Sequence, residues 1–176
     1  MIKEISLRPK PRNKNAVIAF SIALAVSFAV FAVYLAIDRY KGIVGMLGLF
    51  TLTTAILFYT KFIAPTFYYD ITFDANETPV FVVRQITGKR QTTLCRINLA
   101  DITAVKRETR REQRAHKTPS GTLKYVYAPT MMPPEIFRIY VSGQYERAEI
   151  LIEASEEFAN LLLEYAEEAR LSSEEE

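Results

Sequence analysis

The sequence contains few of the residues on which catalysis and metal binding most often depend. Its 176 residues include one cysteine, Cys95, one histidine, His116, and six glycines that fall in expected turns or in apolar runs. A lone cysteine cannot form an intramolecular disulfide, so the fold does not require an oxidising compartment. The sequence has no zinc-ligand spacing, phosphate-binding loop or nucleophile elbow. We therefore expect no catalytic residue, no metal site and no cofactor.

Charged residues are absent from two long stretches near the start of the chain. Residues 16–37 and 42–60 contain no Asp, Glu, Lys or Arg, and only residues 38–41 separate them. At about 1.5 Å of rise per residue, the first run gives about 33 Å of helix, which spans a bilayer core. The second run continues beyond Lys61, whose long side chain reaches the headgroups, and Pro65 stops it.

These two runs predict a transmembrane helical hairpin over residues 16–64, with helices at 16–37 and 42–63. Small residues recur along one side of the first helix and glycines begin the second, which favours packing within the hairpin over dimerisation. The absence of ionisable groups from the two uncharged runs argues against a channel, proton relay or transporter. A cleaved signal peptide also begins with basic and then apolar residues, but this run is too long and a second follows at once.

Basic residues around the hairpin predict its orientation. Five precede the first helix, whereas the turn between the helices carries only two. Cytoplasmic segments of membrane proteins are enriched in Lys and Arg, so we expect a multi-pass protein of the cell membrane with both termini in the cytoplasm. The basic residues before the first helix are Lys3, Arg8, Lys10, Arg12 and Lys14, and those in the turn are Arg39 and Lys41.

After Pro65 the sequence changes to short segments rich in β-branched and aromatic residues. Such segments, separated by turn residues, predict about seven antiparallel strands in one soluble domain. Gly88 with Lys89 is the expected tip of a hairpin between the second and third strands. The expected strands lie at residues 67–73, 79–87, 92–98, 101–106, 123–128, 135–141 and 147–154.

The chain ends in an expected amphipathic helix. Ser155 is its predicted N-cap, and Glu156 and Glu157 follow at the positive end of the helix dipole. The apolar residues that follow recur at helical spacing and form one face, which must cover a hydrophobic surface. These residues are Phe158, Leu161, Leu162, Tyr165 and Ala169.

This arrangement resembles the bacterial pleckstrin-homology-like domains of membrane proteins with a two-helix anchor. The segments that carry the resemblance are YYDIT, FVVRQITGKRQTTLCRI, LADITAVK and ILIEASEEFANLLLEYAEEA. The resemblance implies an α+β domain in which two bent antiparallel sheets form a barrel or sandwich and the C-terminal helix closes its open end. It also implies binding or scaffolding without catalysis. The expected division is a basic N-terminus at 1–15, the hairpin at 16–64, the domain at 65–171 and an acidic tail at 172–176.

The segment KRETRREQRAHK, residues 106–117, is the most unusual part of the predicted domain, because only Ala115 in it is apolar. We expect a solvated basic strip. Read as a helix, Arg107, Arg110, Arg111 and Arg114 share a face, and read as a strand, Lys106, Arg110, Arg114 and His116 share a side. The candidate binding residues are Lys106, Arg107, Arg110, Arg111, Arg114 and Lys117.

The basic strip suits anionic lipid headgroups or an acidic protein segment, and a solvated hairpin with internal Glu–Arg pairs is the alternative without a ligand. A membrane anchor and an acidic C-terminal region argue against nucleic acid. We expect a membrane-anchored binding or scaffolding module that is not an enzyme. The alternatives are an accessory subunit of a membrane transport or secretion complex and a membrane enzyme with a site where the helices meet the domain.

The predicted orientation can be tested with single cysteines at Ser6, Tyr40 and Ser173 in a Cys95→Ser background. Because both termini are expected in the cytoplasm, an impermeant thiol reagent applied to intact cells should label only the cysteine at position 40. Labelling of position 173 from outside would contradict this orientation.

Overall fold

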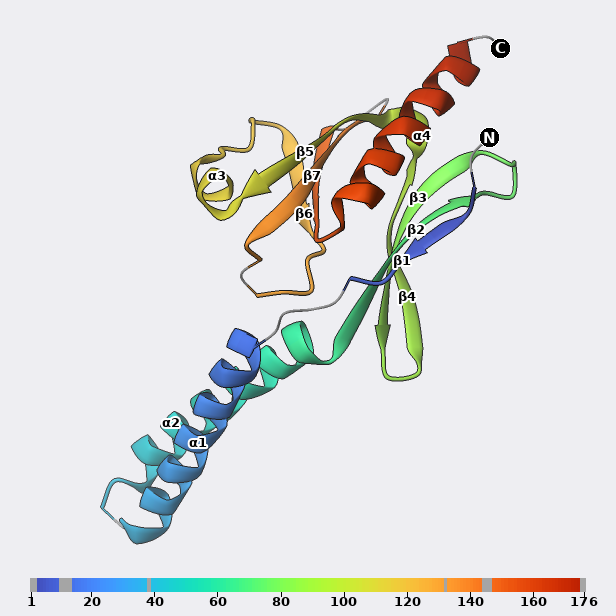
Figure 1. Ribbon diagram of the computed structural model, residues 1–176. Coiled ribbons are helices and arrows are strands. Elements are labelled where there is room, and N and C mark those ends of the chain that lie inside the picture. The colour runs from blue at the N-terminus through green and yellow to red at the C-terminus, as the bar shows by residue number, and fades with distance from the viewer. Residues whose placement is uncertain (1–2, 10–13, 38, 132, 144–146, 175–176) are drawn as a thin grey trace. The chain divides into compact units, whose positions relative to one another are not determined.

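The computed structural model describes residues 3–9, 14–37, 39–131, 133–143 and 147–174 (Figure 1). The chain divides into two compact units. A helical unit comprises Arg12–Pro65, and a sheet unit comprises Met1–Pro11 together with Thr66–Glu176. The sheet unit is therefore assembled from chain segments on both sides of the helical unit.

The helical unit contains the two expected apolar helices. Helix α1 spans Lys14–Ala36 and α2 spans Lys41–Phe58, after which the π-helical turn η1 continues through Tyr59–Ile63. Both helices are long and apolar enough to cross a membrane, as judged by length and composition. The prediction of two such helices in a hairpin is confirmed, and their insertion into a bilayer stays a prediction.

Glycines of α2 allow it to approach α1 closely. A Cβ atom added at Gly45 would lie 3.5 Å from Cε2 of Tyr34, and one added at Gly48 would lie 3.4 Å from Cγ1 of Val30. Gly45 and Gly48 therefore face α1 of the same hairpin. This supports the interpretation that the small residues serve packing within the hairpin.

Sheet A contains four strands in the order β1-β2-β3-β4. Strand β1 pairs antiparallel with β2, so that Ser6 lies opposite Asp70, and Ser6 donates a hydrogen bond to the Asp70 carboxylate. This strand lies within residues 1–15, which we expected to be only a basic N-terminal segment. The strands are β1 (Ile5–Leu7), β2 (Pro65–Phe73), β3 (Pro79–Thr87) and β4 (Arg90–Asn98).

Sheet B contains the remaining strands in the order β5-β7-β8-β6. Strand β7 pairs antiparallel with β5 and with β8, whereas β6 pairs parallel with β8. The short helix α3 lies between β5 and β6, and the 3₁₀ turn η2 connects the two sheets. The elements are η2 (Leu99–Asp101), β5 (Ile102–Thr109), α3 (Arg110–Ala115), β6 (Thr122–Val126), β7 (Glu135–Ser142) and β8 (Arg147–Ile152).

The expected fold was about seven antiparallel strands in a barrel or sandwich, and the structure differs from it in two respects. The described residues form two four-stranded sheets without a closed barrel, and one strand pair is parallel. The connection between β6 and β7, residues 127–134, contains three prolines and is too long for a tight hairpin. Strand β6 consequently joins the far edge of the sheet beside β8 instead of pairing with β7.

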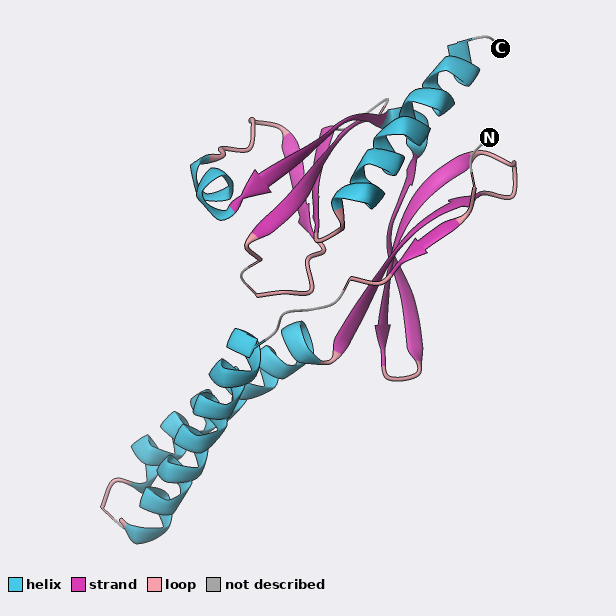
Figure 2. Ribbon diagram, in the orientation of Figure 1, coloured by secondary structure: helices cyan, strands magenta, loops and turns pink. Residues whose placement is uncertain are grey.

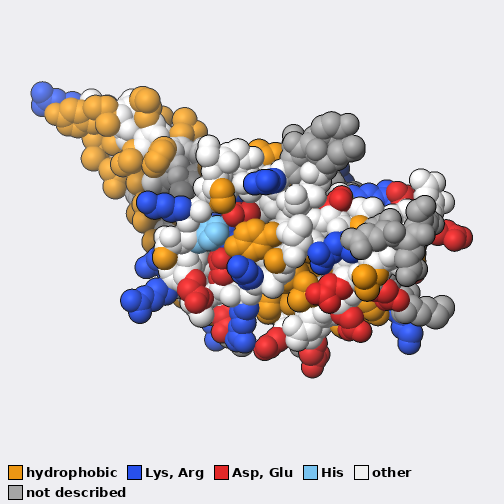
Figure 3. All heavy atoms as spheres, turned by 90° about the horizontal axis from the view of Figure 1, so that it is seen from above, with side chains coloured by type: hydrophobic (Ala, Val, Ile, Leu, Met, Phe, Trp, Pro, Cys, Tyr) orange, Lys and Arg blue, Asp and Glu red, His pale blue; other side chains and the backbone are white. Residues whose placement is uncertain are grey.

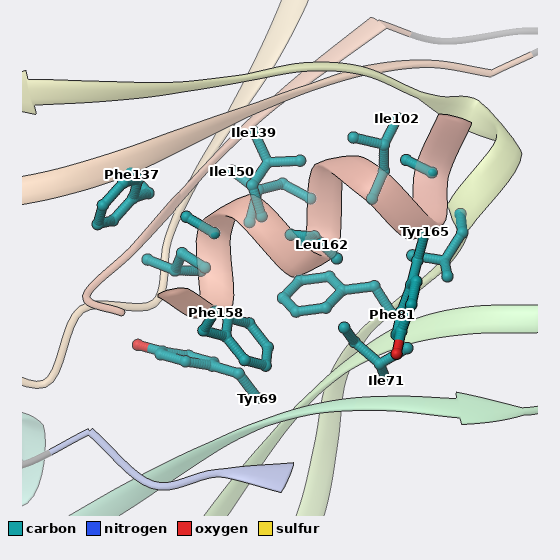
Figure 4. Close-up of a cluster of buried hydrophobic side chains, with 14 of the residues drawn as sticks. Tyr69, Ile71, Phe81, Ile102, Phe137, Ile139, Ile150, Phe158, Leu162 and Tyr165 are labelled. Atoms are coloured by element: carbon teal, nitrogen blue, oxygen red, sulfur yellow. The ribbon is translucent and has the colours of Figure 1, made fainter. Parts of the chain in front are cut away.

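Helix α4 (Glu156–Glu174) packs between the two sheets (Figure 2). Ser155 caps it as predicted, because its Oγ accepts a hydrogen bond from the backbone N–H of Phe158 at 3.3 Å. Leu162 is fully buried, with Ile139 and Ile150 of sheet B on one side and residues of sheet A on the other (Figure 4). The helix continues through Glu174, into the residues expected as an acidic tail.

Tyr69 of β2 links the two sheets beside this helix. Its hydroxyl donates to the carbonyl oxygen of Tyr127 at 2.6 Å and accepts from the backbone N–H of Glu153 at 3.3 Å. Burial raises the pKa of Tyr69, so the hydroxyl remains protonated and able to donate. The core therefore contains polar contacts between the sheets in addition to its apolar contacts.

Replacing Leu162 by Asp should unfold the sheet unit, because it removes leucine packing and places a carboxylate among apolar groups. We expect a loss of about 3 kcal/mol or more in the free energy of unfolding. The exposed control Glu164→Ala should change it little. Denaturant titration of the full chain in detergent measures both, and equal midpoints for the two variants would contradict the position of α4.

Candidate functional site

The six candidate basic residues do not form one strip. Lys106 and Arg107 lie in β5, where successive side chains point to opposite faces of the sheet. Arg110, Arg111 and Arg114 lie in α3. Lys117 lies in the connection from α3 to β6. Both expected geometries were therefore wrong for the whole segment, because a strand changes to a helix in its middle.

The two basic residues of β5 are engaged within the protein. The Lys106 Nζ lies 5.5 Å from the centre of the Tyr140 ring. The Arg107 guanidinium forms ion pairs with Glu135 at 2.7 Å and with Glu156 at 3.2 Å. Arg107 therefore connects β5 to the first residue of α4.

Helix α3 begins at a capping box that the sequence contains as Thr-Arg-Arg-Glu. The Glu112 carboxylate accepts hydrogen bonds from the backbone N–H of Thr109 at 2.7 Å and from its hydroxyl at 2.8 Å. These hydrogen bonds hold the pKa of Glu112 below its usual range. The Thr-x-x-Glu spacing was a sequence signal for this helix, and it was missed.

The arginines of α3 form an exposed basic surface. Arg110, Arg111 and Arg114 are exposed and, with Ala115, line an open hollow of about 640 Å³. Residues i, i+1 and i+4 of a helix lie on neighbouring parts of its surface, so these side chains gather on one side. We call Arg110, Arg111 and Arg114 the arginine face.

A buried ionic cluster lies on the face of sheet B that is turned away from α4. Arg138 of β7 has no exposed surface, and its neighbours Phe137 and Ile139 point to the other face, into the core. Its guanidinium binds both carboxylate oxygens of Glu108 at 2.7 Å and one oxygen of Glu149 at 2.5 Å. The three strands β5, β7 and β8 thus each contribute one charged group.

The chain that follows α3 covers this cluster. The Nε2 atom of His116 lies 3.0 Å from Oε1 of Glu149, and its Nδ1 lies 3.8 Å from Oε1 of Glu108. Thr118 donates to Oε2 of Glu149 at 3.2 Å. Figure 3 shows His116, the chain's single histidine, at the surface in pale blue with acidic side chains beside it.

The expectation that residues 106–117 form only a solvated surface is therefore wrong. Glu108 and Glu149 are 7% and 0% exposed, and the His116 side chain is 22% exposed. The segment buries a charged cluster instead of apolar side chains, which a hydrophobicity pattern does not reveal. Glu149 and Arg138 were not identified as related residues because they lie in other strands.

Neighbouring groups stabilise the charged forms of Glu149 and Arg138. Burial opposes the charge of Glu149, but the hydrogen bond with His116 and the charge of Arg138 outweigh it and lower the pKa of Glu149. Burial likewise opposes the charge of Arg138, and the hydrogen bonds and charge of Glu108 outweigh it, which raises the pKa of Arg138. The contact between Arg138 and Glu149 is therefore an ion pair.

This geometry suits anion binding at the arginine face better than chemistry at the cluster. Across the part of the chain that the structure describes, no three His, Cys, Asp or Glu residues are placed to hold a metal ion. Arg138 lies between the two carboxylates and supplies the positive charge that a metal would otherwise provide. Burial raises the pKa of the Cys95 thiol, which keeps it protonated and weakly nucleophilic.

Comparison with protein-family models finds no family that matches the chain, and comparison with curated proteins finds no match. The function is therefore inferred from the residues described above.

Arg138→Met should destabilise the sheet unit by about 3–5 kcal/mol, because two buried carboxylates lose their counterion. The matched control is Arg96→Met, which breaks an exposed ion pair with Asp74 and should cost less than about 1 kcal/mol. Denaturant titration of the full chain in detergent compares the two. If both variants unfold at the same denaturant concentration, the cluster does not stabilise the fold.

Proposed function

We propose that this protein is a membrane-anchored binding module of the pleckstrin-homology-like type, which acts without catalysis and whose arginine face orients it on anionic lipid. Two helices of membrane-spanning length support the anchor. Two four-stranded sheets packed around a C-terminal helix support the domain type. The added strand β1 and the parallel pairing of β6 are departures from the two antiparallel sheets that the family resemblance implies.

The observation that carries the lipid assignment is the exposure of the arginine face. Its three arginines occur within a helix of only six residues and line one open hollow, whose lining contains no residue of the buried cluster. Apart from Glu112, which caps α3, exposed glutamates of the sheet unit lie outside this helix, for example Glu157, Glu164 and Glu167 of α4. The sheet unit therefore presents surfaces of opposite charge. An anionic membrane attracts the arginine face and repels the surface that carries the glutamates.

An anchored domain is already at the membrane, so recruitment is not the use of these arginines. Each basic residue close to an anionic leaflet contributes up to about 1 kcal/mol of attraction. That attraction favours orientations of the domain in which the arginine face meets the headgroups. Because the screening length at physiological salt is about 8 Å, only residues near the surface contribute, and added salt weakens the effect.

The orientation should be detectable in full-length protein reconstituted in nanodiscs, with a fluorophore on a cysteine at Ser120 in a Cys95→Ser background. One disc contains phosphatidylcholine alone and the other an equal mixture with phosphatidylglycerol, each with a trace of lipid that carries a quencher on its headgroup. We expect stronger quenching in the phosphatidylglycerol discs at low salt, because the arginine face brings position 120 close to the headgroups. High salt should remove the difference.

The matched comparison uses two double charge reversals. Arg111→Glu with Arg114→Glu should abolish the effect of phosphatidylglycerol, whereas Lys89→Glu with Arg90→Glu, at the exposed tip of the β3–β4 hairpin, should preserve it. Both pairs change the net charge equally. Equal quenching in the two kinds of disc, or loss of the effect with both pairs, would reject the lipid assignment and favour an acidic protein segment as the ligand.

A further inference from the structure

We propose that His116 is a positioning residue: by binding Glu149 it fixes the chain over the ionic cluster and thereby holds the arginine face in a preformed arrangement. We call residues 110–121 the cover segment. Two measurements test this inference. The first is the effect of anionic lipid on the position of the domain, and it rests on the proposed function. The second is how firmly the cover segment is attached to sheet B, and it depends on no ligand.

The cover segment is attached to sheet B at both of its ends. Near its start, the backbone N–H of Arg110 donates to the carbonyl of Pro134 at 3.0 Å, and the Gln113 amide donates to the carbonyl of Glu108 at 3.2 Å. Beyond α3, the attachments are the contacts of His116 and Thr118 with Glu149. The second pair of contacts is made to a carboxylate, and hydrogen bonds to a charged group are the stronger kind.

His116 completes the binding of a fully buried carboxylate. Oε2 of Glu149 already accepts hydrogen bonds from Arg138 and Thr118, whereas His116 is the contact described for Oε1. A carboxylate oxygen shut away from water without a donor carries a large desolvation cost. The contact between His116 and Glu149 therefore stabilises the position in which the cover segment lies over the ionic cluster.

His116 is also the residue at which α3 ends. Its backbone N–H donates to the carbonyl of Glu112 at 2.8 Å, and its side chain is the point where the end of the helix meets the sheet. A helix of six residues does not persist in water by itself, because isolated helices of fewer than about 12 residues are marginal. The arginine face exists as a helix surface only while tertiary contacts hold α3 in place.

A preformed arginine face and a flexible basic segment should respond differently to the loss of His116. For a flexible segment, the affinity for an anionic surface depends on the number of charges alone. His116 contacts Glu149 and is not part of the arginine face, so its removal would leave the three arginines and their attraction to lipid unchanged in a flexible segment. If the arginine face is preformed, loss of His116 loosens the cover segment. Lipid binding must then include the entropy cost of ordering the arginines, which weakens it.

The test uses the full chain in the two nanodiscs described above, with His116→Ala, His116→Gln and Thr103→Val. Glutamine retains a side-chain donor for Glu149 at position 116. Thr103→Val is the control, since it removes a hydrogen bond of 3.2 Å from Thr103 of β5 to the carbonyl of Tyr140 and leaves the contacts of the cover segment in place. Each variant is measured for tryptic cleavage after Arg110, Arg111, Arg114 and Lys117, with fragments identified by mass, and for quenching at position 120.

We expect His116→Ala to be cleaved within the cover segment about tenfold faster than the wild type, the factor that corresponds to one hydrogen bond to a charged group. Its extra quenching in phosphatidylglycerol discs should disappear. His116→Gln should retain most of the protection and of the quenching, and Thr103→Val should match the wild type. Thr118→Val provides a second test of the attachment to Glu149 if His116→Ala does not fold.

The outcomes separate the two proposals. Wild-type cleavage rates in both His116→Ala and Thr118→Val would overturn the positioning role. Faster cleavage with unchanged dependence on phosphatidylglycerol would also overturn it, because the arginines would then act as a flexible segment. If the wild type shows no dependence on phosphatidylglycerol, the lipid function fails, and the cleavage rates alone support or overturn the attachment of the cover segment.

Discussion

The guanidinium of Arg138 is the group on which the organisation of sheet B depends. It is the positive charge buried with the carboxylates of Glu108 and Glu149, and it lies on the central strand β7 between β5 and β8. A buried ion pair of this kind contributes little more to the stability of the fold than apolar packing would. Removing one of its charged groups, however, is strongly destabilising, because the other charge stays buried without a partner. The neighbouring strands β5, β7 and β8 bring these charges together, and the cover segment keeps them away from water.

The two faces of sheet B therefore have different roles. On one face, Phe137, Ile139 and Ile150 join α4 and sheet A in the apolar core. On the other face, the same strands carry the charged cluster and the chain that leads to the arginine face. The core stabilises the sheet unit, and the charged face gives a short helix a defined place on the surface.

Much of this fold could be predicted from the sequence where the signal is local. The apolar runs fixed both long helices, β-branched segments identified seven of the strands, and Ser155 marked the start of α4. Three features depend on distant partners and were missed. Strand β1 has only three residues, the parallel pairing of β6 depends on β8, and Arg138, between Phe137 and Ile139, gave no indication of its two carboxylates.

The pairing of β1 with β2 has a consequence for how the chain is made. These neighbouring strands lie on opposite sides of the hairpin in the sequence, so α1 and α2 together form the connection between them. If both helices cross a bilayer, Ile5 and Ile71 can pair only when the chain has crossed and returned to the side from which it started. Sheet A then stays incomplete at the ribosome until the second crossing has been made, and a chain that begins at Thr66 lacks its edge strand permanently.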